Sequence, residues 1–208
     1  MEKDLKEKLK ILAVSDLHGD QRTVKRLAEK AEKENVDLVF ICGDFIAHDD
    51  EFTNMVGPFL KKNKKVFLLA GNHETPEEVQ FIADVYDVKT LHGYSAVYKN
   101  VGIFGSGGVD IGMKGIPDKE IFSNLKKSFA KVKELPKKVM VTHVHPSGTK
   151  MQHMTQFFAP SPAVRKAVDE FQPDILICGH VHEAAGLEEQ IGKTKVINVS
   201  KNGKIIEI

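Results

Sequence analysis

Short apolar runs alternate along the chain with segments in which apolar residues recur at helical spacing. The runs suit buried strands, and the amphipathic segments suit helices that cover a sheet. The strands predicted in this way span residues 11–14, 36–42, 65–70, 90–92, 95–99, 101–106, 138–142 and 174–178. The predicted helices span residues 20–34, 50–63, 75–86, 117–131 and 161–171.

The order strand, helix, strand, helix predicts an α/β fold, with parallel strands in the first half and more antiparallel strands late. Two packed sheets flanked by helices would accommodate so many short strands. Segment 150–162 shows no period, so we expect a loop over apolar packing rather than a lid or a dimer contact. From residue 184 onward the pattern predicts hairpins that turn at Gly192 and at Asn202-Gly203. The sequence contains no linker or repeat, so residues 1–208 are predicted to form one domain.

Composition narrows the classes of partner. The 208 residues are 41% hydrophobic and 28% charged, which is ordinary for a globular protein. A formal net charge of +1, without a basic stripe, argues against nucleic-acid and membrane-surface binding. No run is long enough to cross a membrane and the N-terminus has no apolar signal region, so we expect a cytoplasmic protein. Cys42 and Cys178 each end an apolar run and are expected to be core residues, with no disulfide implied.

Polar residues with metal-binding side chains follow five of the predicted strands. They are Asp16 with His18, Asp44, Asn72 with His73, His143, and His180 with His182. The carboxyl ends of the strands in an α/β sheet form the edge where ligands bind, so we expect these side chains to meet at one edge of one sheet. Asp16 and His18 are two residues apart, and on an extended backbone both side chains would leave on the same side.

The types of ligand indicate which metals could bind. Imidazoles with carboxylates and an amide suit Mn, Fe, Co, Ni or Zn, whereas sites for Mg or Ca are nearly all oxygen. The set is too large for one tetrahedral ion, but two divalent ions about 3.5–4 Å apart that share a carboxylate would use all of it. Asp44 is the best candidate for the shared ligand, because its strand lies between the two His-bearing ends. Two cations favour phosphate esters as substrates, because they can clamp a phosphoryl oxygen.

The chain resembles the calcineurin-like metallophosphoesterase superfamily, and in particular its small single-domain prokaryotic members. The resemblance covers about residues 11–198 and rests on five motifs in the family's order: Asp16-x-His18, Gly43-Asp44, Gly71-Asn72-His73-Glu74, His143 and Gly179-His180-x-His182. It implies a four-layer α/β/β/α sandwich of two mixed sheets flanked by helices. It also implies a hydrolase of phosphate mono- or diesters with two divalent cations and a metal-bridging hydroxide as the nucleophile.

The family pattern implies a role for each of these residues. One ion would be held by Asp44 with Asp16, His18 and His182, and the other by Asp44 with Asn72, His143 and His180. His73 would be the catalytic histidine that is not a ligand and that steadies the transition state or protonates the leaving group. Some members act as assembly subunits and lack part of this set, so the alternative function is a non-catalytic scaffold or partner-binding protein. The complete set in this chain argues against that alternative.

Several neighbouring residues have two interpretations. Ala47 stands where many family members have Asp or Asn, which leaves the orientation of the ligands open. His145 could contact the ligands or the substrate, although the sequence slightly favours a solvated loop position. Glu74 could orient His73 or stabilise a helix N-terminus, and Asp20 could support the site or cap a helix.

Overall fold

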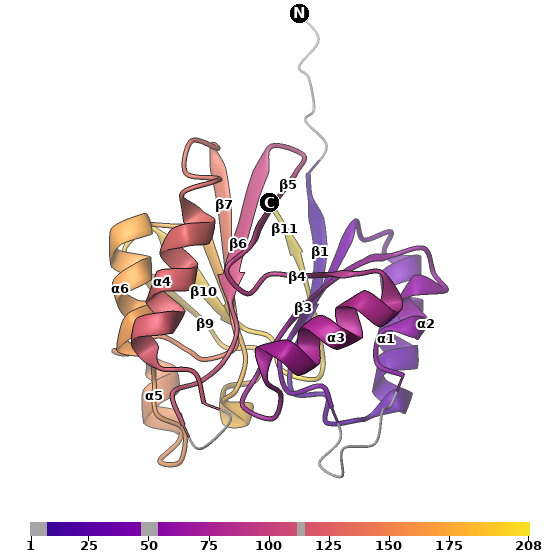
Figure 1. Cartoon of the computed structure of the whole chain (residues 1–208), viewed down its shortest axis with the longest axis horizontal. Helices are drawn as coiled ribbons and strands as arrows, with labels where there is room; N and C mark the ends of the chain where they lie inside the picture. Colours follow the sequence, from indigo (N-terminus) through magenta and orange to yellow (C-terminus); the bar gives the residue numbers. More distant parts are fainter. Residues whose placement is uncertain (1–7, 47–53, 112–114) are drawn as a thin grey trace, which may run out of the picture.

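The first of two β-sheets is built mainly from the N-terminal half of the chain. The computed structural model describes residues 8–46, 54–111 and 115–208. In this sheet the strands lie in the order β11-β1-β2-β3-β4 (Figure 1). Their bounds are β1 Lys10–Val14, β2 Leu38–Cys42, β3 Lys65–Leu69, β4 Lys89–Thr90 and β11 Lys204–Glu207. All neighbours are parallel except β11, which runs antiparallel to β1 with Lys10 opposite Glu207.

The second sheet has the strand order β5-β6-β7-β8-β10-β9. The bounds are β5 Ser95–Tyr98, β6 Val101–Ser106, β7 Lys137–Thr142, β8 Ile175–Cys178, β9 Glu188–Ile191 and β10 Thr194–Asn198. Its four central strands are parallel, and only the edge strands β5 and β9 pair in antiparallel fashion. All neighbours among β1 to β4 are parallel and the antiparallel pairings of the described strands involve β5, β9 and β11, so antiparallel strands do become more frequent late, at the edges of the sheets.

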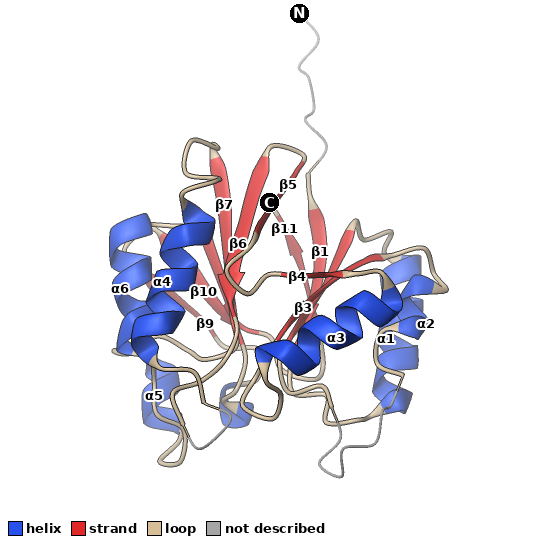
Figure 2. Ribbon diagram, in the orientation of Figure 1, coloured by secondary structure: helices blue, strands red, loops and turns tan. Residues whose placement is uncertain are grey.

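Helices cover the outer faces of both sheets, as Figures 1 and 2 show. The first sheet is covered by α1 Gln21–Lys33, α2 Gly57–Leu60 and α3 Pro76–Tyr86. The second sheet is covered by α4 Asp118–Phe129 and α6 Pro162–Phe171. The chain also forms a short helix, α5 Lys150–Met154, and a 3₁₀ turn, η1 His182–Ala184. The layers run α, β, β, α, so the predicted four-layer sandwich is confirmed. No helix in the described ranges is both long and apolar enough to cross a bilayer.

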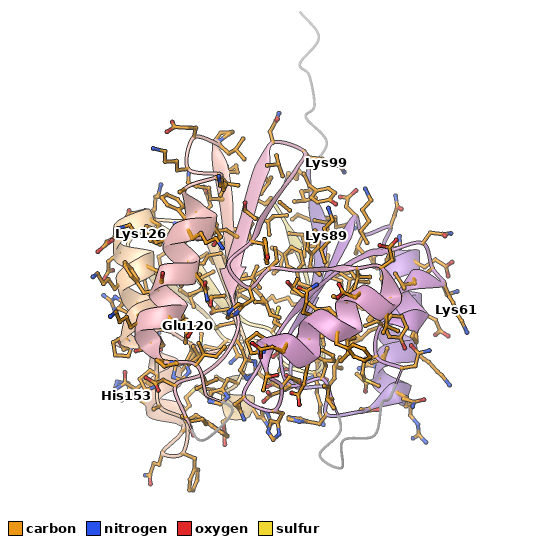
Figure 3. The ribbon with its side chains drawn as sticks, in the orientation of Figure 1. Lys61, Lys89, Lys99, Glu120, Lys126 and His153 are labelled. Carbon is orange, nitrogen blue, oxygen red and sulfur yellow. The ribbon has the colours of Figure 1, made fainter. Side chains whose placement is uncertain are left out.

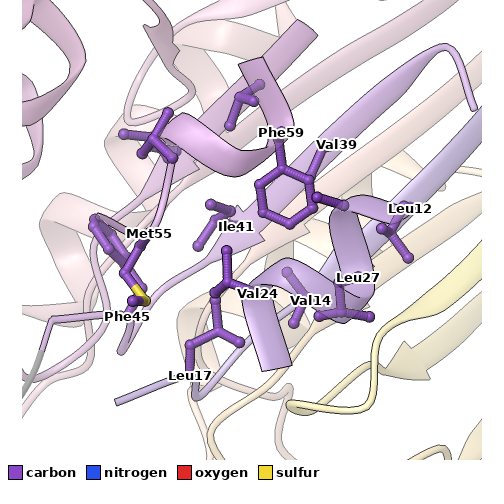
Figure 4. Close-up of a cluster of buried hydrophobic side chains, with 14 of the residues drawn as sticks. Leu12, Val14, Leu17, Val24, Leu27, Val39, Ile41, Phe45, Met55 and Phe59 are labelled. Atoms are coloured by element: carbon purple, nitrogen blue, oxygen red, sulfur yellow. The ribbon is translucent and has the colours of Figure 1, made fainter. Parts of the chain in front are cut away.

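Alternation along β1 explains how the layers hold together. Leu12 and Val14 point outward into the cluster beneath α1, which Figure 4 shows. Ile11 and Ala13 point inward and join a second cluster that lies between the two sheets. All four side chains are fully buried. A strand covered on both faces must be apolar throughout, which is why residues 11–14 have no polar side chain and the first charge after them is Asp16.

Helix starts follow the expected capping chemistry. Asp20 caps α1, because its carboxylate accepts a hydrogen bond of 3.0 Å from the backbone N–H of Thr23. Of the two interpretations of Asp20, the cap is therefore the one the structure supports. Thr75 and Glu78 form a reciprocal capping box at the start of α3, and Pro76 occupies the first helical position.

Three predicted elements differ from the structure. The helix predicted for residues 50–63 falls partly on residues 47–53, which lie outside the described ranges, and only Gly57–Leu60 of the remainder is helical. Pro58 lacks a backbone N–H, so it suits the start of α2 rather than the interior of a longer helix. Segment 150–162 is not wholly a loop, because it contains α5, which is too short to show a helical period. The tail forms one hairpin at Gly192, but beyond Asn202-Gly203 the chain crosses to the first sheet as β11.

Candidate metal centre

The predicted ligands come from the carboxyl ends of strands in both sheets. Asp16, Asp44 and the pair Asn72-His73 follow β1, β2 and β3 of the first sheet. His143 follows β7, and the segment with His180 and His182 follows β8 of the second sheet. The expectation of one edge of one sheet is therefore wrong. The two sheets pack face to face, so the carboxyl ends of both contribute to a single site.

The side chains meet in three overlapping clusters. Within each cluster one ligand atom per residue lies within 4.8 Å of the others. The clusters are Asp16, His18 and His182; His18, Asp44 and His73; and Asp44, His143 and His180. His18 and Asp44 each belong to two of them, and Asp44 is the member that connects His143 and His180 to the other residues, as expected of a shared ligand. The centroid of the His18 ring lies 5.0 Å from that of His73 and 5.6 Å from that of His182.

Turns, rather than extended backbone, bring Asp16 and His18 together. Both have positive φ angles, of 59° and 43°, so the argument from an extended chain is wrong although the two side chains do meet. Asp44 and His180 also have positive φ, at 51° and 69°. Such a conformation costs a non-glycine residue about 1–3 kcal/mol and persists only where its surroundings enforce it. Here the N–H groups of Asp16 and His18 donate to the carbonyls of Gly43 and Asp44, at 3.1 and 3.0 Å.

Asp44 is the centre of the arrangement. Its Oδ1 accepts hydrogen bonds from the backbone N–H groups of Asn72 and His73, at 2.8 and 3.0 Å. Its Oδ2 lies 3.3 Å from His143 Nε2 and 3.9 Å from His73 Nε2. Burial alone would raise the pKa of Asp44, but the charge of His143 and these hydrogen bonds outweigh burial and lower it well below its ordinary value. A Cβ on Gly71 would collide with Oδ1, so the Gly-Asn-His motif can approach this carboxylate only with glycine there.

His143 presents one defined ring nitrogen to the site. Its Nδ1 lies 2.7 Å from the carbonyl oxygen of Cys42, so Nδ1 carries the proton and donates to that oxygen. Nε2 then faces Asp44. A hydrogen bond from the other ring nitrogen is the usual device that fixes the orientation of a metal-ligating histidine. Burial lowers the pKa of His143, but the carboxylate of Asp44 outweighs burial and raises it to about 9.

Asp16 connects the two halves of the site. Its Oδ1 lies 3.4 Å from His182 Nε2, and the backbone N–H of His180 approaches both of its oxygens at 3.3 Å. Burial would raise the pKa of Asp16, but the contact with His182 and the charge of His143 lower it. The same contact raises the pKa of His182. Burial, followed by the charge of His143, lowers the pKa of His180 to about 3, so His180 is neutral and can offer a lone pair.

The donor atoms fit divalent cations. Among the described residues, Asn72 Oδ1 and His180 Nε2 are buried and have no hydrogen-bond partner. Buried polar atoms are rarely left without a partner, and unpaired acceptors that converge on carboxylates are accounted for by a cation. The mixture of nitrogen and oxygen donors suits first-row transition metals. The His and Asp clusters therefore fit metal binding.

Cation binding is expected to release a proton from His143. With a pKa of about 9, this side chain is protonated at neutral pH in the metal-free protein, and a cation has to displace that proton. The affinity for Mn²⁺ should therefore rise as the pH increases from about 6.5 to 9. Titration calorimetry in two buffers with different ionisation enthalpies should show different heats at the same pH. Equal heats, together with an affinity that does not change with pH, would contradict this assignment.

Glu74 acts differently from either interpretation of the sequence. It is fully buried, and its carboxylate accepts hydrogen bonds from four backbone N–H groups. Oε1 accepts from Phe45 and Ile46, and Oε2 accepts from Asp44 and Gly71, at 2.7 to 3.0 Å. Glu74 therefore ties the turn after β2 to the turn after β3. Burial, followed by the charge of Asp44, raises its pKa.

The prediction for His145, a solvated loop position, is wrong. It is not a solvated loop residue, because its side chain is completely buried. Burial, followed by the charge of His143, lowers its pKa to about 4, so its ring is neutral. It is not a member of any of the three clusters found among the described residues.

Two further residues at the site were missed from the sequence. The Phe158 ring lies 4.5 Å from that of His180 and 6.2 Å from that of His182, so segment 150–162 forms one apolar wall of the site. Nothing in the sequence pattern around Phe158 indicates that its ring lies at the site, because the segment is irregular and shows no period. Asn198 is the last residue of the strand β10, close to where the predicted ligands stand on their strands, and that position could have singled it out. His153, labelled in Figure 3, is exposed on α5.

Comparison with known proteins decides the family. Residues 9–184 match the sequence profile of the calcineurin-like phosphoesterases. The chain belongs to the calcineurin-like phosphoesterase family. No curated protein matches the sequence.

Solved structures of the same fold come from several kingdoms. TT1561 of Thermus thermophilus superposes with a TM-score of 0.74 at 14% identity, over 97% of this chain and 99% of that one. A structure described as a novel archaeal phosphodiesterase has a TM-score of 0.54 at 17% identity, over 96% and 99% of the two chains. A dimetal phosphatase from Danio rerio has a TM-score of 0.62 at 11% identity, over 94% and 88%. At these identities the likeness establishes the fold.

Proposed function

We propose that this member of the family hydrolyses phosphate mono- or diesters at a centre of two divalent cations. Asp16, His18, His182 and Asp44 would hold one cation, and Asn72, His143, His180 and Asp44 the other. The observation that carries the proposal is the shared position of Asp44, which belongs to two of the ligand clusters. Mn, Ni, Co, Fe and Zn are the metals that this donor set suits.

When bound, the cations would supply Lewis acidity toward the phosphoryl oxygens and would lower the pKa of water at the site. The protein's own contribution is to hold the ligands rigidly. Asp44 is fixed by two backbone N–H groups, His143 by the carbonyl of Cys42 and Asp16 by the N–H of His180. Ligands fixed in this way need little rearrangement when charge develops on the phosphoryl group.

His73 is proposed to donate a proton to the leaving oxygen or to stabilise its developing charge. Its side chain is 34% exposed, so a substrate can reach it, whereas Asp44 is buried. Its ring packs edge-on against His18, and its backbone N–H donates to Asp44, so its position relative to the site is fixed. An imidazole at the rim of the site is suited to general acid catalysis.

A pocket of about 210 Å³ opens beside Asp16, His18 and His182. Its remaining wall is made by Ala185 and by residues 200–202 of the turn that leads to β11. We propose that substrate enters here, because the pocket gives solvent access to Asp16, His18 and His182. The side beneath Phe158 is closed by the apolar ring.

The test is a panel of nitrophenyl phosphate mono- and diesters with added Mn²⁺, Ni²⁺ or Co²⁺. We expect turnover that depends on metal, disappears with EDTA and returns when the metal is restored. Asp44→Asn, which removes the shared charge at nearly constant volume, should lose both cation binding and turnover. Tight binding of two cations without turnover of any ester would instead favour the non-catalytic scaffold.

A further inference from the structure

Asn198 is a fully buried amide at the carboxyl end of β10, directly beneath the segment that carries His180 and His182. Its Nδ2 donates to the carbonyl of Gly179 at 3.2 Å and to the carbonyl of Val181 at 3.0 Å. These two carbonyls flank His180. The side chain of Asn198 therefore forms hydrogen bonds with the backbone on both sides of the proposed ligand His180.

The orientation of this amide is determined by its neighbours. Both groups that face Nδ2 are carbonyl oxygens, which only accept hydrogen bonds, so the NH₂ group must face them. Asn198 Oδ1 has no partner among the described residues. The backbone of Asn198 also contacts the segment, since its N–H donates to Leu187 and its carbonyl accepts from Gly186, both at 3.0 Å. Four hydrogen bonds thus join one residue to the segment 179–187.

The segment needs this support because of its conformation. His180 has a φ of 69°, which L-residues avoid, so a local constraint has to hold it. In that conformation its N–H points to the carboxylate of Asp16, at 3.3 Å from both oxygens. Its side chain simultaneously lies in the cluster with Asp44 and His143. One peptide therefore supports groups proposed for both cations.

We infer that Asn198 is a positioning residue of the metal centre, which holds the peptides on either side of His180 so that Asp16 and His180 reach their cations together. This inference rests on the proposed two-cation function. Asn198 acts through the backbone, because its Nδ2 donates to the carbonyls of Gly179 and Val181 and not to the side chain of a proposed ligand. Partners of this kind behind the ligands typically contribute a factor of about 10–100 to metal affinity.

The experiment measures Mn²⁺ binding by equilibrium dialysis and by electron paramagnetic resonance. Asn198→Asp keeps the size of the side chain but opposes a carboxylate to two carbonyls, and Asn198→Ser keeps a single donor. We expect Asn198→Asp to lower the affinity for at least one cation by about 10–100-fold, and Asn198→Ser to have a smaller effect. The spin-coupled signal of a close Mn pair should give way to that of isolated Mn²⁺.

Thr194→Val is the matched control. Thr194 is fully buried on the same strand, and its hydroxyl donates to the carbonyl of Pro173 at 2.6 Å, so this variant also loses one buried hydrogen bond. Thr194 lies about 13 Å from Asn198 along the strand, at 3.3 Å per residue. The Thr194→Val variant should therefore keep the Mn²⁺ affinity and the spin-coupled signal of the wild type. If Asn198→Asp does not fold, Asn198→Ser takes its place.

The outcomes separate the two proposals. A wild-type protein that binds fewer than two Mn²⁺ ions would overturn the proposed two-cation function. If the wild type binds two and the Asn198 variants bind two with unchanged affinity and coupling, only the positioning role is wrong. Equal losses in the Asn198 variants and in Thr194→Val would also reject that role, because a general loss of stability would then explain both.

Discussion

His73→Ala is expected to lower the rate of phosphate-ester hydrolysis by about 10²–10⁴-fold, the usual contribution of a general acid or base. The binding of two cations should be retained, because each proposed ligand set is complete without His73. The loss of rate is expected because the His73 side chain is 34% exposed at the rim, where a leaving group can reach it, and its Nε2 lies 3.9 Å from Asp44 Oδ2. Rates with a nitrophenyl ester and cation stoichiometry by dialysis would be measured on the same samples.

The comparison variant is His153→Ala, which removes an exposed histidine on α5 outside the three ligand clusters. It should leave both rate and stoichiometry unchanged. The cluster of His18, Asp44 and His73 also offers His73 as a ligand, and the measurement decides between the two roles. Loss of a cation from His73→Ala would make His73 a ligand, and full activity would remove it from the chemistry altogether.

Glu74→Ala is expected to lower the free energy of unfolding by at least about 3 kcal/mol. Four backbone N–H groups, from the turns after β2 and β3, would lose the carboxylate that accepts their hydrogen bonds. Each buried donor left without a partner costs about 1–3 kcal/mol, although such costs do not simply add. Urea denaturation of the metal-free protein would measure the change, so that lost cation binding does not contribute to it.

Glu74→Gln refines this prediction, since its NH₂ group would oppose two of the backbone donors while its carbonyl still accepts from the other two. We expect a smaller loss than for Glu74→Ala. Glu77→Ala is the control, because Glu77 is exposed in the first turn of the same helix and interacts mainly with the helix dipole, worth about 0.3–1 kcal/mol. If Glu74→Ala and Glu77→Ala had the same free energy of unfolding, the four hydrogen bonds of Glu74 would not be the interaction that stabilises the two turns.

The sequence predicted much of the fold because local and global signals agree in it. The strands that bring the ligands together are apolar runs with charged residues only near their starts, and each is followed by a polar cluster. Asp20 and Thr75 mark helix starts that the structure reproduces. The family motifs added the four-layer order to the two packed sheets that the pattern itself suggested, and the predicted Asp and His ligands from Asp16 to His182 do converge. Their roles as ligands remain a prediction.

The features that could not be predicted from the sequence depend on packing between residues far apart in the chain. The crossing of β11 to the first sheet leaves no local trace, because the turn at Asn202-Gly203 is as compatible with a hairpin. His145 follows a strand by three residues and is fully buried, and its carbonyl accepts a hydrogen bond from the backbone N–H of the distant Ser161. The four hydrogen bonds to Glu74 come from residues up to thirty positions away. Such contacts are set by tertiary structure, which periodicity does not report.

The pairing of β11 with β1 constrains how the protein is assembled in the cell. β1 leaves the ribosome first among the described strands, but its outer neighbour is the last of them to be synthesised. Until then β1, which leads into Asp16, is an exposed edge that invites pairing with other nascent chains. Contacts across nearly the whole sequence also slow folding. Emergence of β11, rather than emergence of the first half of the chain, is therefore the event after which the sheet that carries Asp16 is complete.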